Sequence, residues 1–143
     1  RALPDDGALV TLEVDHMHAR VAQANLDRAG LSDRAEIRVG PAIDSLAAMT
    51  DVAPFDMVFI DADKQRNVDY VAEAIRLGHS GTTIIVDNVV REGGVLDAAS
   101  DDARIQGTRA LFDFLQSDPR IDATAVQTVG AKGWDGFVLA RVV

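Results

Sequence analysis

Residues 56–64 read Asp-Met-Val-Phe-Ile-Asp-Ala-Asp-Lys, and this stretch decides the fold class. Asp56–Ile60 is a short, mostly apolar run, and such runs are typical of strands that are buried on both faces of a sheet. Three charged residues, Asp61, Asp63 and Lys64, follow close behind it. Because ligands of open α/β sheets bind outside the carboxyl ends of the strands, this arrangement predicts a binding site directly after the strand.

Further segments on either side of this stretch have strand-like or helix-like patterns. The predicted strands are Ala8–Val14, Ala35–Val39, Asp56–Ile60, Thr82–Val86, Ile121–Thr128 and Gly136–Val142. The predicted helices are Met17–Ala29, Ala42–Met49, Val68–Leu77 and Arg104–Leu115. Strands that alternate with helices indicate a mostly parallel sheet with helices on its faces, and therefore an α/β protein. The last two strands flank Gly130–Gly133 and predict an antiparallel hairpin, and Gly93–Asp102 is expected to be a mobile loop.

The length and composition of the chain indicate how many domains it has and which kinds of partner it lacks. The chain has 143 residues, which predicts a single domain over residues 1–143. Its net charge of −9 argues against nucleic acid as a partner, because phosphate binding needs clustered Lys and Arg. It has no cysteine, which excludes disulfides and thiolate zinc sites and leads us to expect a cytoplasmic location. No apolar run approaches the roughly 20 residues of a membrane span, so a membrane partner is not expected.

The first and second predicted strands are also followed by residues that suit a ligand. Glu13 ends the first strand, where a carboxylate could accept two hydrogen bonds from a ribose diol. The alternative is a solvated acid before the next helix, which Asp15 could cap. Gly40-Pro41-Ala42 follows the second strand, and small residues let a flat ring approach the backbone. The same three residues could also form an ordinary turn.

Asp87 and Asn88 follow the fourth predicted strand. A single helix joins the third and fourth strands, so we expect these strands to be neighbours and Asp61, Asp87 and Asn88 to converge. Carboxylate and amide oxygens are the ligands that hard cations such as Mg²⁺ prefer. An Asx turn at Asp87 and a polar loop at Asp61–Lys64 are the alternatives.

Taken together, these motifs resemble the cation-dependent O-methyltransferases, which include the caffeoyl-coenzyme A and catechol O-methyltransferases. The resemblance covers essentially the whole chain, and its motifs are Val10–Asp15, Gly40–Ala42, Phe59–Lys64, Val86–Asn88 and the hairpin residues Trp134–Gly136. It implies a Rossmann-like methyltransferase fold and S-adenosylmethionine as cofactor. It also implies a small hydroxylated substrate, expected to be a catechol-like aromatic, and a homodimer is a further expectation.

The same resemblance implies which residues contact the cofactor. Glu13 would hold the ribose hydroxyls of S-adenosylmethionine. Ala42 would lie against the adenine ring. Asp63 would lie beside the sulfonium and amino-acid part of the cofactor.

It also implies a metal site and a base. Asp61, Asp87 and Asn88 would bind a divalent cation, expected to be Mg²⁺ with Ca²⁺ or Mn²⁺ as alternatives. Lys64 would be the catalytic base that removes the proton of the substrate hydroxyl. A metal bound to a diol would orient the hydroxyl and favour its ionisation.

The start of the chain departs from the family pattern. The family's cofactor fold begins with a strand that runs into a glycine-rich loop, whereas this chain opens at Arg1–Gly7, which we interpret as the end of the following helix. We therefore expect the sheet to lack its first strand, which the family has between the first and third strands of this chain. Its absence would expose two strand edges or force a closer pairing. We favour the explanation that the sequence belongs to a longer protein over a genuinely truncated one.

Two other functions remain open at this point. The missing glycine loop would fit a catalytically inactive, truncated methyltransferase-fold domain. Glu13 would also fit a nucleotide-dependent oxidoreductase, although no glycine fingerprint accompanies it.

Overall fold

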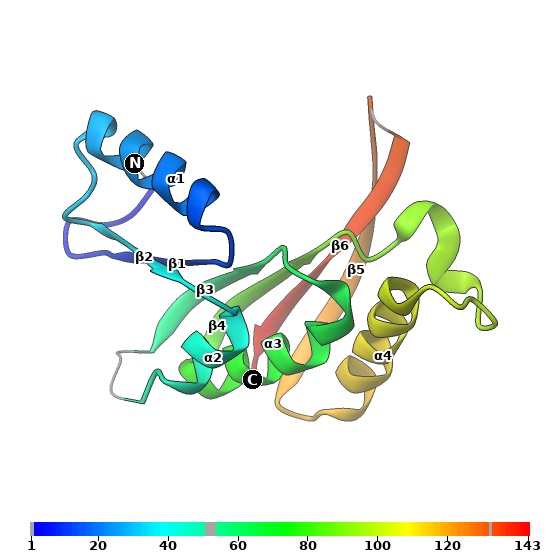
Figure 1. The fold of residues 1–143 in the computed structure, drawn as a ribbon. Helices are drawn as coiled ribbons and strands as arrows, with labels where there is room; N and C mark the ends of the chain where they lie inside the picture. The colour runs from blue at the N-terminus through cyan, green and yellow to red at the C-terminus, as the bar shows by residue number, and fades with distance from the viewer. Residues whose placement is uncertain (1, 51–53, 132) are drawn as a thin grey trace. The chain divides into compact units, whose positions relative to one another are not determined.

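The chain alternates strands with helices in the computed structural model, which describes residues 2–50, 54–131 and 133–143 (Figure 1). Its elements are β1 (Leu9–Glu13), α1 (His16–Ala29), β2 (Ala35–Val39), α2 (Ala42–Ala47), β3 (Phe55–Ile60), the 3-10 helix η1 (Lys64–Arg66), α3 (Asn67–Leu77), β4 (Gly78–Asp87), the 3-10 helix η2 (Arg91–Leu96), α4 (Ala103–Ser117), β5 (Ile121–Gly130) and β6 (Gly133–Val142). Each strand and helix predicted from the sequence is present, with ends that differ by a few residues. The α/β class and the antiparallel C-terminal hairpin are therefore confirmed, while Lys132 of the predicted turn lies outside the described residues.

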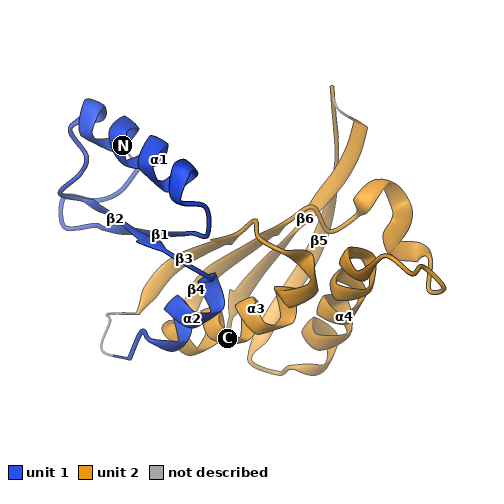
Figure 2. Cartoon of the chain, viewed as in Figure 1, with its two compact units in different colours: residues 1–50 blue, residues 51–143 orange. Residues whose placement is uncertain are grey.

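The strands form two sheets, as expected if a strand is missing between β1 and β3. The chain divides into two compact units, residues 1–50 and residues 51–143 (Figure 2). One sheet has the order β1-β2 and the other has the order β3-β4-β6-β5. A sheet continues only through backbone hydrogen bonds, and in the described residues β1 and β3 each have a strand partner on one side. The expected exposed edges are thus present, and the expectation of a single domain stays a prediction.

The first unit is a parallel strand pair with a connecting helix whose two ends are well defined. β1 and β2 are parallel, and α1 joins them. The Asp15 carboxylate caps α1 by accepting the backbone N–H groups of Met17 and His18, at 2.7 and 3.1 Å. The helix ends before Gly30, which has a left-handed φ of 67°. Both ends agree with the sequence interpretation.

The second unit is a four-stranded sheet with α3 and α4 on one face (Figure 1). β3 and β4 are parallel, whereas β6 is antiparallel to both β4 and β5. Alternate residues of β4 and β6 are buried, as expected for a pleated sheet with one covered face. The buried strand residues include Ile60, Ile84, Val86, Val138, Ala140 and Val142.

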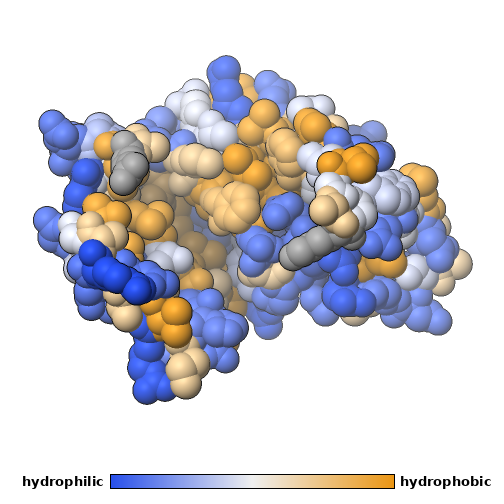
Figure 3. All heavy atoms as spheres, turned by 90° about the horizontal axis from the view of Figure 1, so that it is seen from above, coloured by the Kyte–Doolittle hydropathy of each residue, from blue (hydrophilic) through white to orange (hydrophobic). Residues whose placement is uncertain are grey.

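The other face of this sheet carries apolar side chains that remain exposed. Met57 and Phe59 of β3 are 58% and 59% exposed, and Leu139 of β6 is 41% exposed. They alternate along their strands with residues that are half-buried or buried, which places them on the opposite face from α3 and α4. In the view from above, hydrophobic residues also lie at the surface among polar ones (Figure 3).

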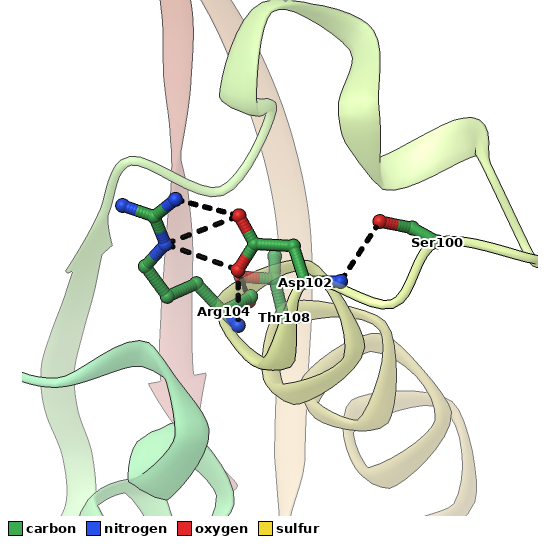
Figure 4. Close-up of polar contacts among 4 residues, drawn as sticks. All are labelled: Ser100, Asp102, Arg104 and Thr108. Atoms are coloured by element: carbon green, nitrogen blue, oxygen red, sulfur yellow. Dashed lines mark hydrogen bonds and ion pairs between the residues drawn. The ribbon is translucent and has the colours of Figure 1, made fainter.

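Helix α4 begins at a network of polar contacts (Figure 4). The Asp102 carboxylate caps the helix by accepting the backbone N–H of Arg104 at 2.8 Å, and it also pairs with the Arg104 guanidinium at 2.6 Å. These hydrogen bonds, the guanidinium first, lower the pKa of Asp102 to about 2. Ser100 accepts the backbone N–H of Asp102, and the Thr108 hydroxyl donates to the carbonyl oxygen of Arg104.

The segment between β4 and α4 differs from the long loop that the sequence predicted. Its first part, Arg91–Leu96, is a 3-10 helix that is interrupted at Glu92 and Gly93, where φ is 53° and 87°. The prediction missed this helix because two adjacent glycines, Gly93 and Gly94, disfavour helical structure in a sequence pattern. Among the described helices, none is long and apolar enough to cross a membrane.

Candidate functional site

Two aspartates leave neighbouring strands of the second unit at the same edge. Ile60 of β3 and Val86 of β4 are paired in the parallel register, so Asp61 and Asp87 are the next residues along the two strands. Neighbouring strands lie about 4.8 Å apart. The prediction that β3 and β4 are neighbours is confirmed, and the backbone carries both carboxylates to the carboxyl end of this sheet.

Lys64 lies beside this pair. It opens η1 directly after β3, and its side chain is only 7% exposed. Its Nζ donates to Oδ1 of Asp61 at 3.0 Å. A buried ammonium needs such a partner, because an unpaired charge away from water is strongly unfavourable. Lys64 is therefore held with its amine next to a predicted metal ligand.

Asp63 is held in place by Tyr70 of helix α3. The Tyr70 hydroxyl donates to Oδ1 of Asp63 at 2.5 Å, and Nε of Arg66 lies 3.7 Å from Oδ2. Burial of the ring, and then the hydrogen bond to the carboxylate, raise the pKa of Tyr70 well above its usual value. Tyr70 consequently stays protonated as a donor, and Asp63 is fixed while its side chain remains about half exposed.

Asp87 and Asn88 lie at the end of β4. The backbone N–H of Asn88 donates to Oδ1 of Asp87 at 2.7 Å. An Asx turn would instead use the N–H two residues after Asp87, so this contact is not the Asx turn that the sequence left open. Asn88 has a φ of 57°, an unusual conformation for a residue other than glycine. Both side chains are half-buried, so their remaining oxygens keep access to a ligand.

The residues at this edge have the donor chemistry that a hard cation needs. Asp61, Asp87 and Asn88 offer two carboxylates and an amide oxygen, and Mg²⁺ takes such oxygens together with water and substrate. No group of three or more His, Cys, Asp or Glu residues suited to a metal is found in the part of the chain that the structure describes. A cation here would therefore need the amide oxygen of Asn88 as its third protein ligand.

The first unit places its two predicted cofactor residues at one edge of its own sheet. Glu13 ends β1, is paired in register with Val39 of β2, and accepts the backbone N–H of Asp15 at 2.8 Å through its carboxylate. The Gly40 N–H donates to the Glu13 carbonyl oxygen at 2.9 Å, so the turn that leads to Ala42 begins beside Glu13. Ala42 is half-buried as the first residue of α2. The arrangement leaves a carboxylate next to a turn of small residues, and the cofactor roles of Glu13 and Ala42 stay predictions.

Four residues of the second unit that lie near Asp63, Lys64 or the segment after Asn88 were not assigned to the site from the sequence. Tyr70 is seven positions after Asp63, about two helical turns, and that spacing could have suggested their contact. Asn67 is fully buried beside η1, and its side-chain amide has no hydrogen-bond partner in the described structure. Gly107 contacts the backbone of Lys64, and Asp135 accepts the backbone N–H groups of Val90 and Arg91. These partners are far apart in the sequence, so no local pattern indicates the contacts.

Comparison with known proteins places these features in a family. The family model described as O-methyltransferase matches residues 1–143. The chain is 53% identical over 142 residues to a catechol O-methyltransferase of Mycobacterium tuberculosis, and 49% identical over 144 residues to one of Niastella koreensis. These matches cover 99% of this chain and 64% and 65% of the two relatives, so the chain spans less than two thirds of their length.

Solved structures agree with this assignment. The O-methyltransferase of Bacillus cereus in complex with SAH superposes with a TM-score of 0.97 at 50% identity, over 100% of this chain and 66% of that one. The O-methyltransferase TomG of Streptomyces achromogenes in complex with SAM gives a TM-score of 0.96 at 43% identity, over 100% of this chain and 65% of that one. The Rossmann-like O-methyltransferase fold expected from the sequence is confirmed.

Proposed function

Because the chain belongs to the O-methyltransferase family, we propose that the protein transfers a methyl group from S-adenosylmethionine to a hydroxyl of a small, catechol-like aromatic substrate with the help of a divalent cation. The observation that carries the proposal is the register of β3 and β4, which takes Asp61 and Asp87 to one sheet edge beside the buried Lys64. The names of the two catechol O-methyltransferases support the substrate class.

The metal site would consist of Asp61, Asp87 and Asn88. Three protein oxygens leave positions for both oxygens of a diol, which suits a cation that requires oxygen ligands. Mg²⁺ is the first candidate, and Mn²⁺ or Ca²⁺ fit the same donor set. Asp61 would then serve the cation and Lys64 together, since its Oδ1 already accepts from Nζ.

Lys64 would act as the base of the reaction. The bound cofactor supplies an electrophilic methyl group, and the cation favours ionisation of the hydroxyl that it binds. The hydroxyl oxygen would take the methyl group from the cofactor, and Lys64, whose Nζ lies beside Asp61, would accept the hydroxyl proton. Since this is an in-line displacement, positioning by the protein should supply much of the acceleration.

Three residues would hold the cofactor. We assign the ribose hydroxyls to Glu13, the adenine ring to Ala42, and the sulfonium and amino-acid part to Asp63. Glu13 fits this role because a strand-end carboxylate can accept hydrogen bonds from two adjacent hydroxyls. Asp63 fits because its carboxylate is fixed by Tyr70 yet exposed, and a carboxylate attracts a cationic sulfonium and ammonium.

Calorimetric titration of S-adenosylmethionine into the 143-residue chain, with and without Mg²⁺, tests the proposal. We expect binding by the wild type, weaker binding by Glu13→Gln, and loss of Mg²⁺ binding in Asp87→Asn. Asp113→Asn is the matched control, because Asp113 is an exposed aspartate in α4 that is not part of the proposed site. Failure of the wild-type chain to bind either S-adenosylmethionine or Mg²⁺ would instead favour an inactive methyltransferase-fold domain.

The role of Lys64 is tested separately with two variants. Lys64→Ala removes both the charge and the base, whereas Lys64→Arg keeps a charge but cannot give up a proton at ordinary pH. If Lys64 is the base, methylation of catechol should fall by about 10²–10⁴-fold in both variants. Near-normal turnover by Lys64→Arg would mean that Lys64 acts through its charge alone.

A further inference from the structure

One carboxylate oxygen of the C-terminal hairpin accepts three backbone hydrogen bonds. Oδ1 of Asp135, in β6, accepts the N–H groups of Val90, Arg91 and Gly136 at 3.0, 2.9 and 2.9 Å. A fourth hydrogen bond joins the same two segments: the Val89 N–H donates to the carbonyl oxygen of Gly136 at 3.0 Å. Two adjacent residues of β6 therefore hold three consecutive residues that come directly after Asn88.

The backbone that Asp135 holds has an unusual conformation. Asn88, Arg91 and Glu92 have φ values of 57°, 55° and 53°, and in the described part of the chain they are the residues other than glycine with positive φ. Such conformations are strained and persist only where the surrounding structure determines them. The backbone N–H groups of Val90 and Arg91 need acceptors, and the Asp135 carboxylate supplies them.

Close packing fixes the same segment against the hairpin. A Cβ built on Gly136 would lie 2.6 Å from Cγ2 of Val90 and 2.5 Å from the carbonyl oxygen of Val126 in β5. Both distances are shorter than side chains tolerate, so only glycine allows this approach. Val89 is fully buried in the same segment. The backbone after Asn88 is thus held by hydrogen bonds from β6 and by contact with it.

We infer that Asp135 is a positioning residue for the metal site. It acts by holding the segment 88–91, and so fixes the direction of the Asn88 side chain, whose amide oxygen is the third proposed ligand. The inference rests on the proposed metal-dependent function, since it assigns a purpose to the geometry of one of that site's ligands. Residues that orient metal ligands in this way typically change metal affinity by about 10–100-fold when they are replaced.

The test compares Mg²⁺ and Mn²⁺ affinity, by calorimetry, among the wild type, Asp135→Ala, Asp135→Asn and the control Asp113→Asn. We expect Asp135→Ala to bind about 10–100-fold more weakly, Asp135→Asn, which keeps an acceptor oxygen, to lose less, and the control to match the wild type. Should Asp135→Ala fail to fold, Asp135→Asn carries the comparison.

Amide hydrogen exchange provides the second readout. In both variants we expect faster exchange at Val90 and Arg91 and unchanged exchange at Ile84, in the buried part of β4. Faster exchange at the two loop amides with wild-type metal affinity would overturn the inference and leave the metal site standing. A wild type that binds neither cation would overturn the metal site itself, and the inference with it.

Discussion

The backbone of Lys64 lies directly against Gly107 of helix α4. A Cβ built on Gly107 would lie 2.6 Å from Cα of Gln65, and its closest contact would be the carbonyl oxygen of Lys64. Glycine in a helix interior is about 1 kcal/mol less favourable than alanine, so the close approach explains its presence there. Helix α4 thereby supports the turn that carries the proposed base.

Gly107→Ala should therefore destabilise the protein, even though alanine favours the helix. Overpacking typically costs about 1–3 kcal/mol, which outweighs the gain in helix propensity. Urea unfolding measures the difference. Asp113→Ala, at an exposed position of the same helix, reports the propensity gain alone and should be neutral or slightly stabilising. A Gly107→Ala variant more stable than the wild type would mean that η1 moves away without cost.

The Tyr70–Asp63 hydrogen bond predicts coupled effects of two substitutions. Tyr70→Phe removes the donor and should lower the free energy of unfolding by about 1–2 kcal/mol, because the bond is to a charged acceptor. It should also weaken S-adenosylmethionine binding, since Asp63 loses its fixed direction. A double-mutant cycle with Asp63→Ala, which removes the acceptor, isolates the interaction. Additive effects of the two substitutions would show that the pair is not coupled.

Acid should weaken the start of helix α4. The pKa of Asp102 is lowered to about 2, chiefly by the Arg104 guanidinium and then by its backbone N–H. A carboxyl with a depressed folded pKa contributes stability above its unfolded pKa of about 3.9 and loses it as the pH falls toward the folded value.

The melting temperature should consequently fall between about pH 4 and about pH 2 in the wild type, and less steeply in Asp102→Asn. Thermal unfolding followed by circular dichroism measures both slopes. Asp113→Asn serves as control and should keep the wild-type slope. Parallel slopes for the wild type and Asp102→Asn would show that the cap does not respond to acid.

His79 should stabilise the protein in the opposite pH range. Its two ring nitrogens lie 3.0 Å from Oδ1 of Asp56 and 2.7 Å from the carbonyl oxygen of Ser80, and these hydrogen bonds, with Asp56 first, raise its pKa. Two acceptors favour the protonated ring, so the stabilisation is full below the unfolded pKa of about 6.5 and is lost as the pH rises through the folded value.

His79→Gln should therefore lower the melting temperature near pH 5.5 more than near pH 9. His16→Gln, at an exposed position in α1, is the control and should show no such difference. An equal loss at both pH values would mean that the His79 contacts do not depend on its charge. His79 lies two residues after the end of α3, which agrees with the stabilising role of a cation near a helix C-terminus.

Local sequence patterns were enough to predict the helices and strands and the meeting of two candidate site residues. Asp15 and Gly30 mark the ends of α1 through side-chain capping and a left-handed turn, which act within a few residues. The meeting of Asp61 and Asp87 could be predicted because a short helical connection joins parallel strands that are neighbours.

Contacts between distant residues could not be predicted in this way. Asp135 accepts from Val90 and Arg91 across 45 and 44 positions, and no periodicity marks such a pair. Gly107 is favoured only because η1 packs against it, whereas helix propensity alone would exclude it.

The exposed face of the four-stranded sheet gives the protein an internal chemical reporter. Met57 on that face is 58% exposed, Met17 in α1 is 56% exposed, and Met49 is 3% exposed. Peroxide converts an accessible methionine to its sulfoxide and spares a buried one. Mass spectrometry can measure the oxidation of Met57 relative to that of Met17 and Met49. A molecule that binds the exposed face of the sheet should therefore lower the oxidation of Met57.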